Sequence, residues 1–127
     1  MTITPKPSLA VALVVATLLY PAVAVRADNV PYEKQLLRLS EILGSIHYLR
    51  SLCGEKDGGW RDQMEALLEA ENPEPVRRAR MIASFNRGYR TYGSVYKTCT
   101  ESATAAIARY MKEGETLSKE VVVRFGD

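Results

Sequence analysis

The feature that most constrains this 127-residue chain is an unbroken helical repeat between Ile82 and Tyr110. Apolar, aromatic and small residues recur there at alternating steps of three and four: Ile82, Phe85, Tyr89, Tyr92, Tyr96, Cys99, Ala103, Ala106 and Tyr110. Such spacing is typical of one face of a long helix that packs along its length. The repeat therefore predicts an all-α fold, and it contains no catalytic motif.

Residues 1–27 have the pattern of a cleaved export signal, in which an uncharged apolar run covers residues 9–20. We expect cleavage after Ala27, with Ala24 as the second choice, because small residues precede both positions. An uncleaved anchor is the alternative, but twelve apolar residues fall short of the roughly 20 that span a bilayer. Residues 28–127 would then form a single domain in the periplasm.

The charge balance changes when the export signal is removed. The full chain has 17 Lys and Arg residues against 15 Asp and Glu residues, but Lys6 and Arg26 both lie in the leader. The mature domain is therefore formally neutral, because 15 basic residues face 15 acidic ones. Such a balance gives no indication of a general affinity for nucleic acid.

The remaining periodicity predicts a bundle of three main helices that run up, down and up, followed by a short fourth helix. We expect the first helix over residues 31–52, and a shorter second helix that begins near Trp60 and is ended by a pair of prolines. The third helix would carry the long repeat over residues 75–113 and stop at Gly114. Residues 116–125 include three consecutive valines, Val121 to Val123, that favour a strand, but a lone strand would have no partner, so we expect a short last helix there.

Two glycines lie inside the expected third helix, but neither occupies a position of its repeat. Gly88 and Gly93 each cost about 1 kcal/mol relative to alanine in a helix interior. One interpretation is the close approach of a neighbouring helix, and the other is a kink near residues 86–88. The unbroken phase of the repeat favours the first.

Cys53 and Cys99 are the two cysteines of the chain, so they allow one intramolecular pairing. Export would place them where disulfides form and persist. We therefore expect a structural disulfide between parallel first and third helices, worth about 4 kcal/mol in the chain-entropy description. A metal site or a redox pair is the competing explanation, but the sequence has no CxxC motif, and the single His47 cannot complete a four-ligand zinc site with two thiols.

No motif for covalent, phosphoryl, hydride or metal-dependent catalysis occurs in the sequence. His47 lies at the edge of the apolar stripe of the first helix, where a partly covered, hydrogen-bonded histidine is the ordinary expectation. We therefore expect no enzyme activity, no cofactor and no bound metal.

Charge is segregated along the chain. Seven acidic residues lie between residues 55 and 74, whereas residues 77–97 contain six basic residues and no acid. On a helical wheel, four of these bases lie opposite the long repeat: Arg80, Arg87, Arg90 and Lys97. They are either a solvated face, partly neutralised by the acidic second helix, or a docking stripe for an anionic envelope partner. The docking stripe indicates a non-enzymatic protein-interaction module of the cell envelope.

The tyrosines of the long repeat allow a second hypothesis, because their hydroxyl groups need partners when buried. In that case, a small-ligand pocket between helices would be lined by Arg50, Trp60, Tyr89, Tyr92 and Tyr96. The alternative is a small core in which these polar groups satisfy one another.

Short motifs spread over the mature chain are Leu52-Cys53-Gly54, Phe85-Asn86-Arg87-Gly88-Tyr89-Arg90-Thr91-Tyr92, Tyr96-Lys97-Thr98-Cys99-Thr100, Ala108-Arg109-Tyr110, Glu113-Gly114 and Arg124-Phe125-Gly126. Together they resemble a family of small exported proteins from alphaproteobacteria, notably the rhizobial group. That family has no assigned activity. The resemblance therefore implies a Gram-negative periplasm and carries over no active-site residues.

Overall fold

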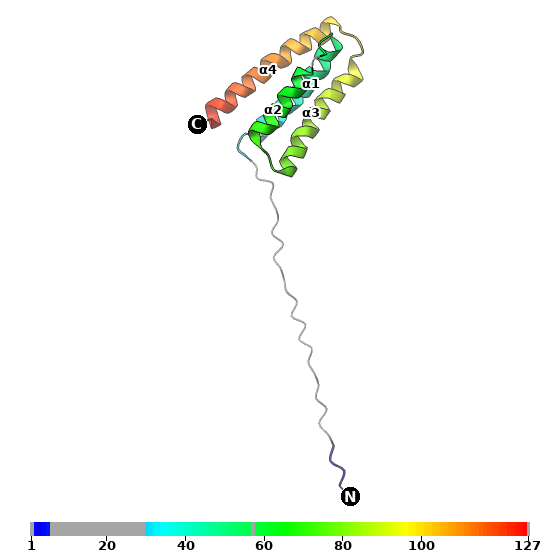
Figure 1. The fold of residues 1–127 in the computed structure, drawn as a ribbon, viewed down its shortest axis with the longest axis vertical. Coiled ribbons are helices and arrows are strands. Elements are labelled where there is room, and N and C mark those ends of the chain that lie inside the picture. The colour runs from blue at the N-terminus through cyan, green and yellow to red at the C-terminus, as the bar shows by residue number, and fades with distance from the viewer. Residues whose placement is uncertain (1, 6–29, 57, 127) are drawn as a thin grey trace.

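The structure is a computed structural model that describes residues 2–5, 30–56 and 58–126. The apolar run of the predicted export signal and its cleavage site after Ala27 lie outside the described residues. The described part contains four helices and no strand, so the predicted all-α fold class is confirmed (Figure 1). The helices are α1 (Glu33–Leu52), α2 (Gly59–Glu71), α3 (Pro75–Val95) and α4 (Glu101–Phe125).

Helix α1 is the central element and packs against each of the other three helices. Its buried residues lie around most of the helix: Leu36, Ser40, Ile42, Leu43, Gly44, Ser45, Ile46 and Leu49. Figure 1 shows α3 and α4 on opposite sides of α1, with α2 overlapping it in that view. A helix that is apolar on most of its circumference is stable only when neighbours cover it, which explains its place in the middle.

The predicted third helix over residues 75–113 is wrong, because α3 ends at Val95 and the chain turns back into α4. An unbroken helix of that length would extend about 58 Å, roughly twice the length of α1, and half of it would lack a packing partner. Thr100 is the N-cap at which α4 begins, since its hydroxyl oxygen accepts a hydrogen bond from the Ala103 backbone nitrogen at 3.1 Å. The long repeat is therefore shared by two antiparallel helices.

The predicted short helix over residues 116–125 is likewise wrong, because these residues continue α4 without a break. Gly114 lies inside α4 and faces α1, where a methyl group on it would make ordinary contact with Ile42 at 3.5 Å. Arg38 of α1 donates to both carboxylate oxygens of Glu113, at 2.7 and 3.0 Å. This bidentate pair lowers the pKa of Glu113 and helps to hold α4 along α1.

Two glycines mark the crossing of α1 and α3. A β-carbon on Gly44 would lie 1.9 Å from the Phe85 carbonyl oxygen, and one on Gly88 would lie 2.1 Å from the Glu41 carbonyl oxygen. The two backbones therefore touch where side chains would normally separate them. Helix α3 is continuous through Gly88, so the close approach of a neighbouring helix is confirmed and the kink is not observed.

The predicted disulfide between Cys53 and Cys99 is confirmed, with their Cα atoms 4.9 Å apart. It joins the C-terminal end of α1 to the turn between α3 and α4, and it does not link two parallel helices as predicted. A small core lies beside it, formed by Leu49, Ala103, Ala106 and Ile107. The crosslink therefore fixes the end of the bundle where three helices meet.

The opposite end of the bundle is held by a buried ion pair that the sequence did not predict. Arg77 is 6% exposed, and its guanidinium group contacts Glu33 at 2.9 Å and Glu71 at 3.5 Å. The hydroxyl group of Tyr32 donates to Glu71 at 3.2 Å. One arginine of α3 thus connects α1 and α2.

Replacing Arg77 with alanine is expected to lower the free energy of unfolding by about 2 to 3 kcal/mol, because it leaves the covered Glu33 carboxylate without its counter-charge. Arg77→Met should cost less, because the aliphatic chain keeps the packing. The matched control is Arg80→Ala on the exposed side of α3, with an expected change within about 0.5 kcal/mol. Denaturant titration measures all three, and equal values for Arg77→Ala and Arg80→Ala would contradict the role given to Arg77.

Candidate functional site on the basic side of α3 and in the adjoining groove

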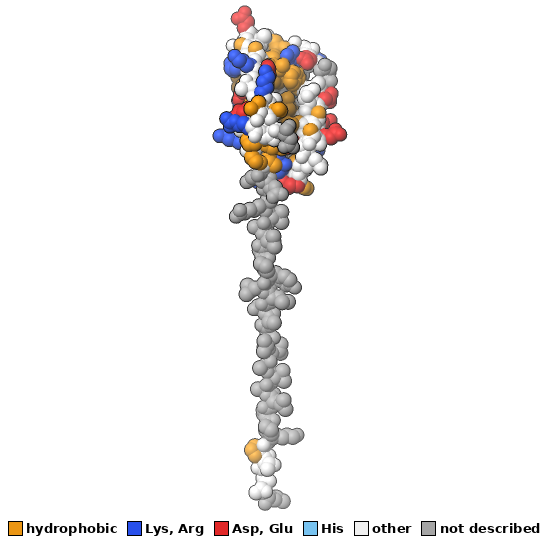
Figure 2. Space-filling view, turned by 90° about the vertical axis from the view of Figure 1, so that its left-hand side faces the viewer, with side chains coloured by type: hydrophobic (Ala, Val, Ile, Leu, Met, Phe, Trp, Pro, Cys, Tyr) orange, Lys and Arg blue, Asp and Glu red, His pale blue; other side chains and the backbone are white. Residues whose placement is uncertain are grey.

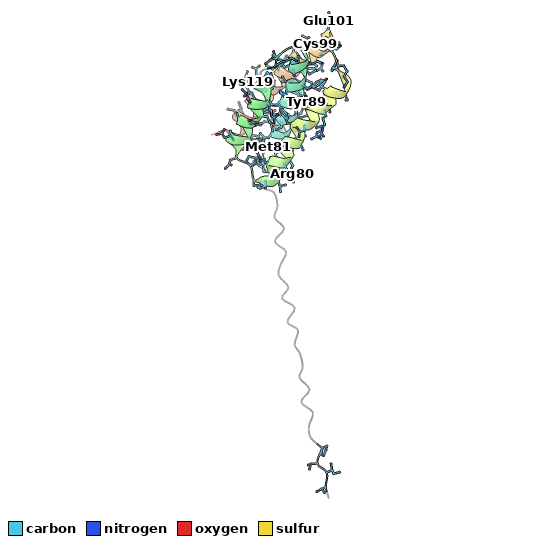
Figure 3. The ribbon with its side chains drawn as sticks, turned by 45° about the vertical axis from the view of Figure 1, so that its right-hand side comes forward. Arg80, Met81, Tyr89, Cys99, Glu101 and Lys119 are labelled. Atoms are coloured by element: carbon cyan, nitrogen blue, oxygen red, sulfur yellow. A yellow bond between two sulfur atoms is a disulfide. The ribbon has the colours of Figure 1, made fainter. Side chains whose placement is uncertain are left out.

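The predicted docking residues are all exposed, but they do not all lie on one helix. Arg80, Arg87 and Arg90 project from α3, with Arg80 near the end of the molecule opposite Cys99 (Figure 3). Lys97 lies in the turn after α3, where its ammonium group donates to the Gly93 carbonyl oxygen, so its predicted place on the helical wheel is wrong. We refer below to Arg80, Arg87 and Arg90 as the basic side of α3.

The basic side of α3 forms no ion pair within the described part of the chain. Arg87 donates to the hydroxyl group of Ser84 at 3.3 Å, and Arg80 and Arg90 form no hydrogen bond or ion pair there. The acidic residues of α2 form their ion pairs elsewhere, as with Glu65 and Glu71. Direct ion pairing with α2, which would have neutralised this side, is therefore not observed.

A groove of about 400 Å³ lies between α2 and α3, with α1 at its base. Its lining combines buried apolar side chains with charged and polar ones: His47, Arg61, Met64, Glu65, Leu68, Arg78, Ile82, Phe85, Asn86 and Tyr89. The two arginines come from different helices, Arg61 from α2 and Arg78 from α3. The sequence alone did not predict that these residues form one groove.

His47 forms part of the base of this groove. Its ring lies 5.8 Å from the Phe85 ring and 5.7 Å from the Tyr89 ring, and it makes these ring contacts in place of the expected hydrogen bond within the described chain. Burial lowers the pKa of His47, and the positive charge of Arg61 lowers it further. The neutral imidazole is therefore an aromatic surface at neutral pH.

The structure divides the five predicted pocket residues among three places. Tyr89 lines the α2–α3 groove and is 40% exposed. Tyr92 and Tyr96 stack on each other near the disulfide, with ring centroids 6.0 Å apart. On another side of α1, the guanidinium group of Arg50 lies 5.8 Å from the centre of the Trp60 ring.

The tyrosines near the disulfide find hydrogen-bond partners within the bundle, as in the alternative of a small core whose polar groups satisfy one another. The hydroxyl groups of Tyr92 and Tyr110 hydrogen-bond to each other, and the hydroxyl group of Tyr48 donates to the Tyr96 carbonyl oxygen. Burial, together with the bond to Tyr110, raises the pKa of Tyr92 to about 12. These contacts give Tyr92 and Tyr96 packing roles in the small core beside the disulfide.

A second hollow, of about 450 Å³, lies between α1 and α4 and is mainly apolar. Trp60, Ile42 and Met111 are among its lining residues. Figure 2 views the molecule from the side where α4 lies and shows a band of hydrophobic side chains there, flanked by charged ones.

None of the described helices is both long enough and apolar enough to cross a bilayer.

No curated protein and no solved structure matches the chain. A family model matches residues 31–125, a range that includes all four helices and both cysteines. This match agrees with the resemblance of the short sequence motifs to an uncharacterised family. The chain therefore belongs to the family described as Protein of unknown function (DUF2385).

Proposed function

We propose that this chain is a non-enzymatic interaction module of the cell envelope, which is exported to the periplasm and docks an anionic partner on the basic side of α3. The observation that carries the proposal is the exposure of Arg80, Arg87 and Arg90, none of which forms an ion pair in the described chain. Like charges that are close together raise the local potential and attract an anionic surface. The three residues cover about 15 Å along the helix, a length that suits a protein or polymer surface better than a single small ion.

Two observations support the export that the proposal requires. The Cys53–Cys99 disulfide is the kind of crosslink that persists in oxidising compartments. The leader pattern in residues 1–27 is that of a signal removed on export. The one histidine of the chain lies beside the Phe85 and Tyr89 rings, at a tilt of 34° to each, and this aromatic setting supports a binding role.

The test is site-specific photo-crosslinking in intact cells from Ala83, an exposed position of α3 between Arg80 and Arg87. We expect crosslinks to one or a few defined envelope components. Reversing Arg80, Arg87 and Arg90 to glutamate should reduce their yield about tenfold or more, because attraction to an anion becomes repulsion. Circular dichroism should show unchanged helicity.

The matched control reverses Lys34, Lys56 and Lys112, which are exposed and form no ion pair in the described chain. It changes the net charge by the same amount but leaves the basic side of α3 intact. We expect crosslinking from Ala83 to stay within about twofold of the unmodified protein. Equal loss in the control, or unaltered crosslinking after the α3 reversal, would refute docking on this side.

A further inference from the structure

The groove between α2 and α3 has the size and the mixed lining of a small-molecule site. Its volume of about 400 Å³ lies within the usual range for ligand pockets, roughly 300 to 1,000 Å³. Met64, Leu68 and Phe85 give it a buried apolar floor. Ligand sites commonly combine such a floor with a few convergent polar groups.

Most polar side chains that line the groove form no hydrogen bond or ion pair with the described residues. Arg78 forms no hydrogen bond or ion pair through its side chain in the described chain. Arg61 has one long contact with Glu65, at 3.8 Å, and both side chains are largely exposed. With His47 neutral, the residues that line the groove carry two guanidinium groups and one carboxylate, which is a single excess positive charge; Asp62 and Glu69 lie nearby but do not line it. A monoanion would complement this charge.

We infer that the groove between α2 and α3 binds a small organic monoanion with an aromatic body, whose acidic group lies between Arg61 and Arg78. The rings of His47, Phe85 and Tyr89 offer adjacent surfaces on which such a body stacks. Guanidinium groups suit a carboxylate or sulfonate because they donate two parallel hydrogen bonds.

This site is separate from the proposed docking surface. Arg78 lines the groove with Ile82 and Tyr89, which lie about one and three helical turns further along the same side of α3, whereas Arg80, Arg87 and Arg90 do not line it. Small-molecule binding and partner docking can therefore be tested independently. The groove also differs from the predicted tyrosine pocket, with which it shares Tyr89.

The experiment uses two probes with the same ring system, 1-anilinonaphthalene-8-sulfonate and its neutral analogue N-phenyl-1-naphthylamine. We expect the sulfonate to bind at one site and about tenfold more tightly than the neutral probe, because it gains charge-assisted hydrogen bonds. Arg61→Met and Arg78→Met should each weaken sulfonate binding about five- to tenfold and leave the neutral probe within about twofold. Arg80→Met is the matched control and should change neither.

Methionine methyl resonances locate the bound probe. Met64 lines the α2–α3 groove, whereas Met111 lines the hollow between α1 and α4. Shifts at the Met64 methyl that saturate with the sulfonate, with Met111 unaffected, would support the inference. Equal affinity for the two probes, insensitivity to both arginine substitutions, shifts centred on Met111 or no saturable binding would each overturn it.

Discussion

Replacing Gly44 with alanine is expected to lower the free energy of unfolding by about 3 kcal/mol or more. The new β-carbon would lie 1.9 Å from the carbonyl oxygen of Phe85 and 2.7 Å from its carbonyl carbon. Both atoms belong to the backbone, so no side-chain rotation relieves the clash and α1 and α3 must move apart. The better helix propensity of alanine offsets only about 1 kcal/mol of this cost.

Thermal and denaturant unfolding measure this effect, and the melting temperature should fall by roughly 12 to 24 °C for a domain of this size. Gly93→Ala is the matched control on α3, because its β-carbon would lie 3.5 Å from the Tyr48 ring, which is ordinary contact. It should be neutral or stabilising by up to about 1 kcal/mol. A Gly44→Ala protein as stable as the Gly93→Ala protein would show that the two helices are not in backbone contact.

The same crossing shows what the sequence could and could not predict. Gly88 was identified as a point of close approach because it interrupts a well-phased helix, and α1 does approach it. Gly44 gave no such signal, because it lies within a run of helix-compatible residues and its partner is 41 residues away in sequence. Contacts of this kind depend on how two helices cross, which the periodicity of each helix alone does not determine.

The turn between α3 and α4 was missed for a related reason. The repeat keeps its phase from Tyr92 through Cys99 to Ala103, because residues on both sides of the turn pack against the same end of α1. The periodicity indicates that both segments pack against a neighbouring helix, but it carries no information about where the chain reverses its direction. The Thr100 cap was the available local signal.

The candidate site was predicted in part. Helical phase was sufficient to place Arg80, Arg87 and Arg90 on the outside of α3, whereas Lys97 required knowing where the helix ends. Predicting the groove would have required the relative position of α2 and α3. The groove lining includes Arg78, one helical turn before Ile82, where the long repeat begins. Following that repeat one step further back along the chain would have drawn attention to this arginine.

Removing the disulfide by Cys53→Ala and Cys99→Ala is expected to lower the free energy of unfolding by about 4 kcal/mol. The crosslink closes a loop across a sequence separation of 46 residues, so its loss restores much conformational freedom to the unfolded chain. In the folded state, Leu49, Ala103 and Ala106 beside it should become the first part of the core to open.

Denaturant unfolding of the oxidised protein, the reduced protein and the double alanine variant measures this cost. The reduced protein and the variant should unfold at similar, lower denaturant concentrations, and reductant should leave the variant unchanged. Amide exchange should rise most in the first turns of α4, next to the turn that holds Cys99, and least near the buried Arg77 pair. If oxidised and reduced proteins unfold together, then packing around α1 alone holds the α3–α4 turn, and the crosslink provides no evidence that the fold depends on an oxidising compartment.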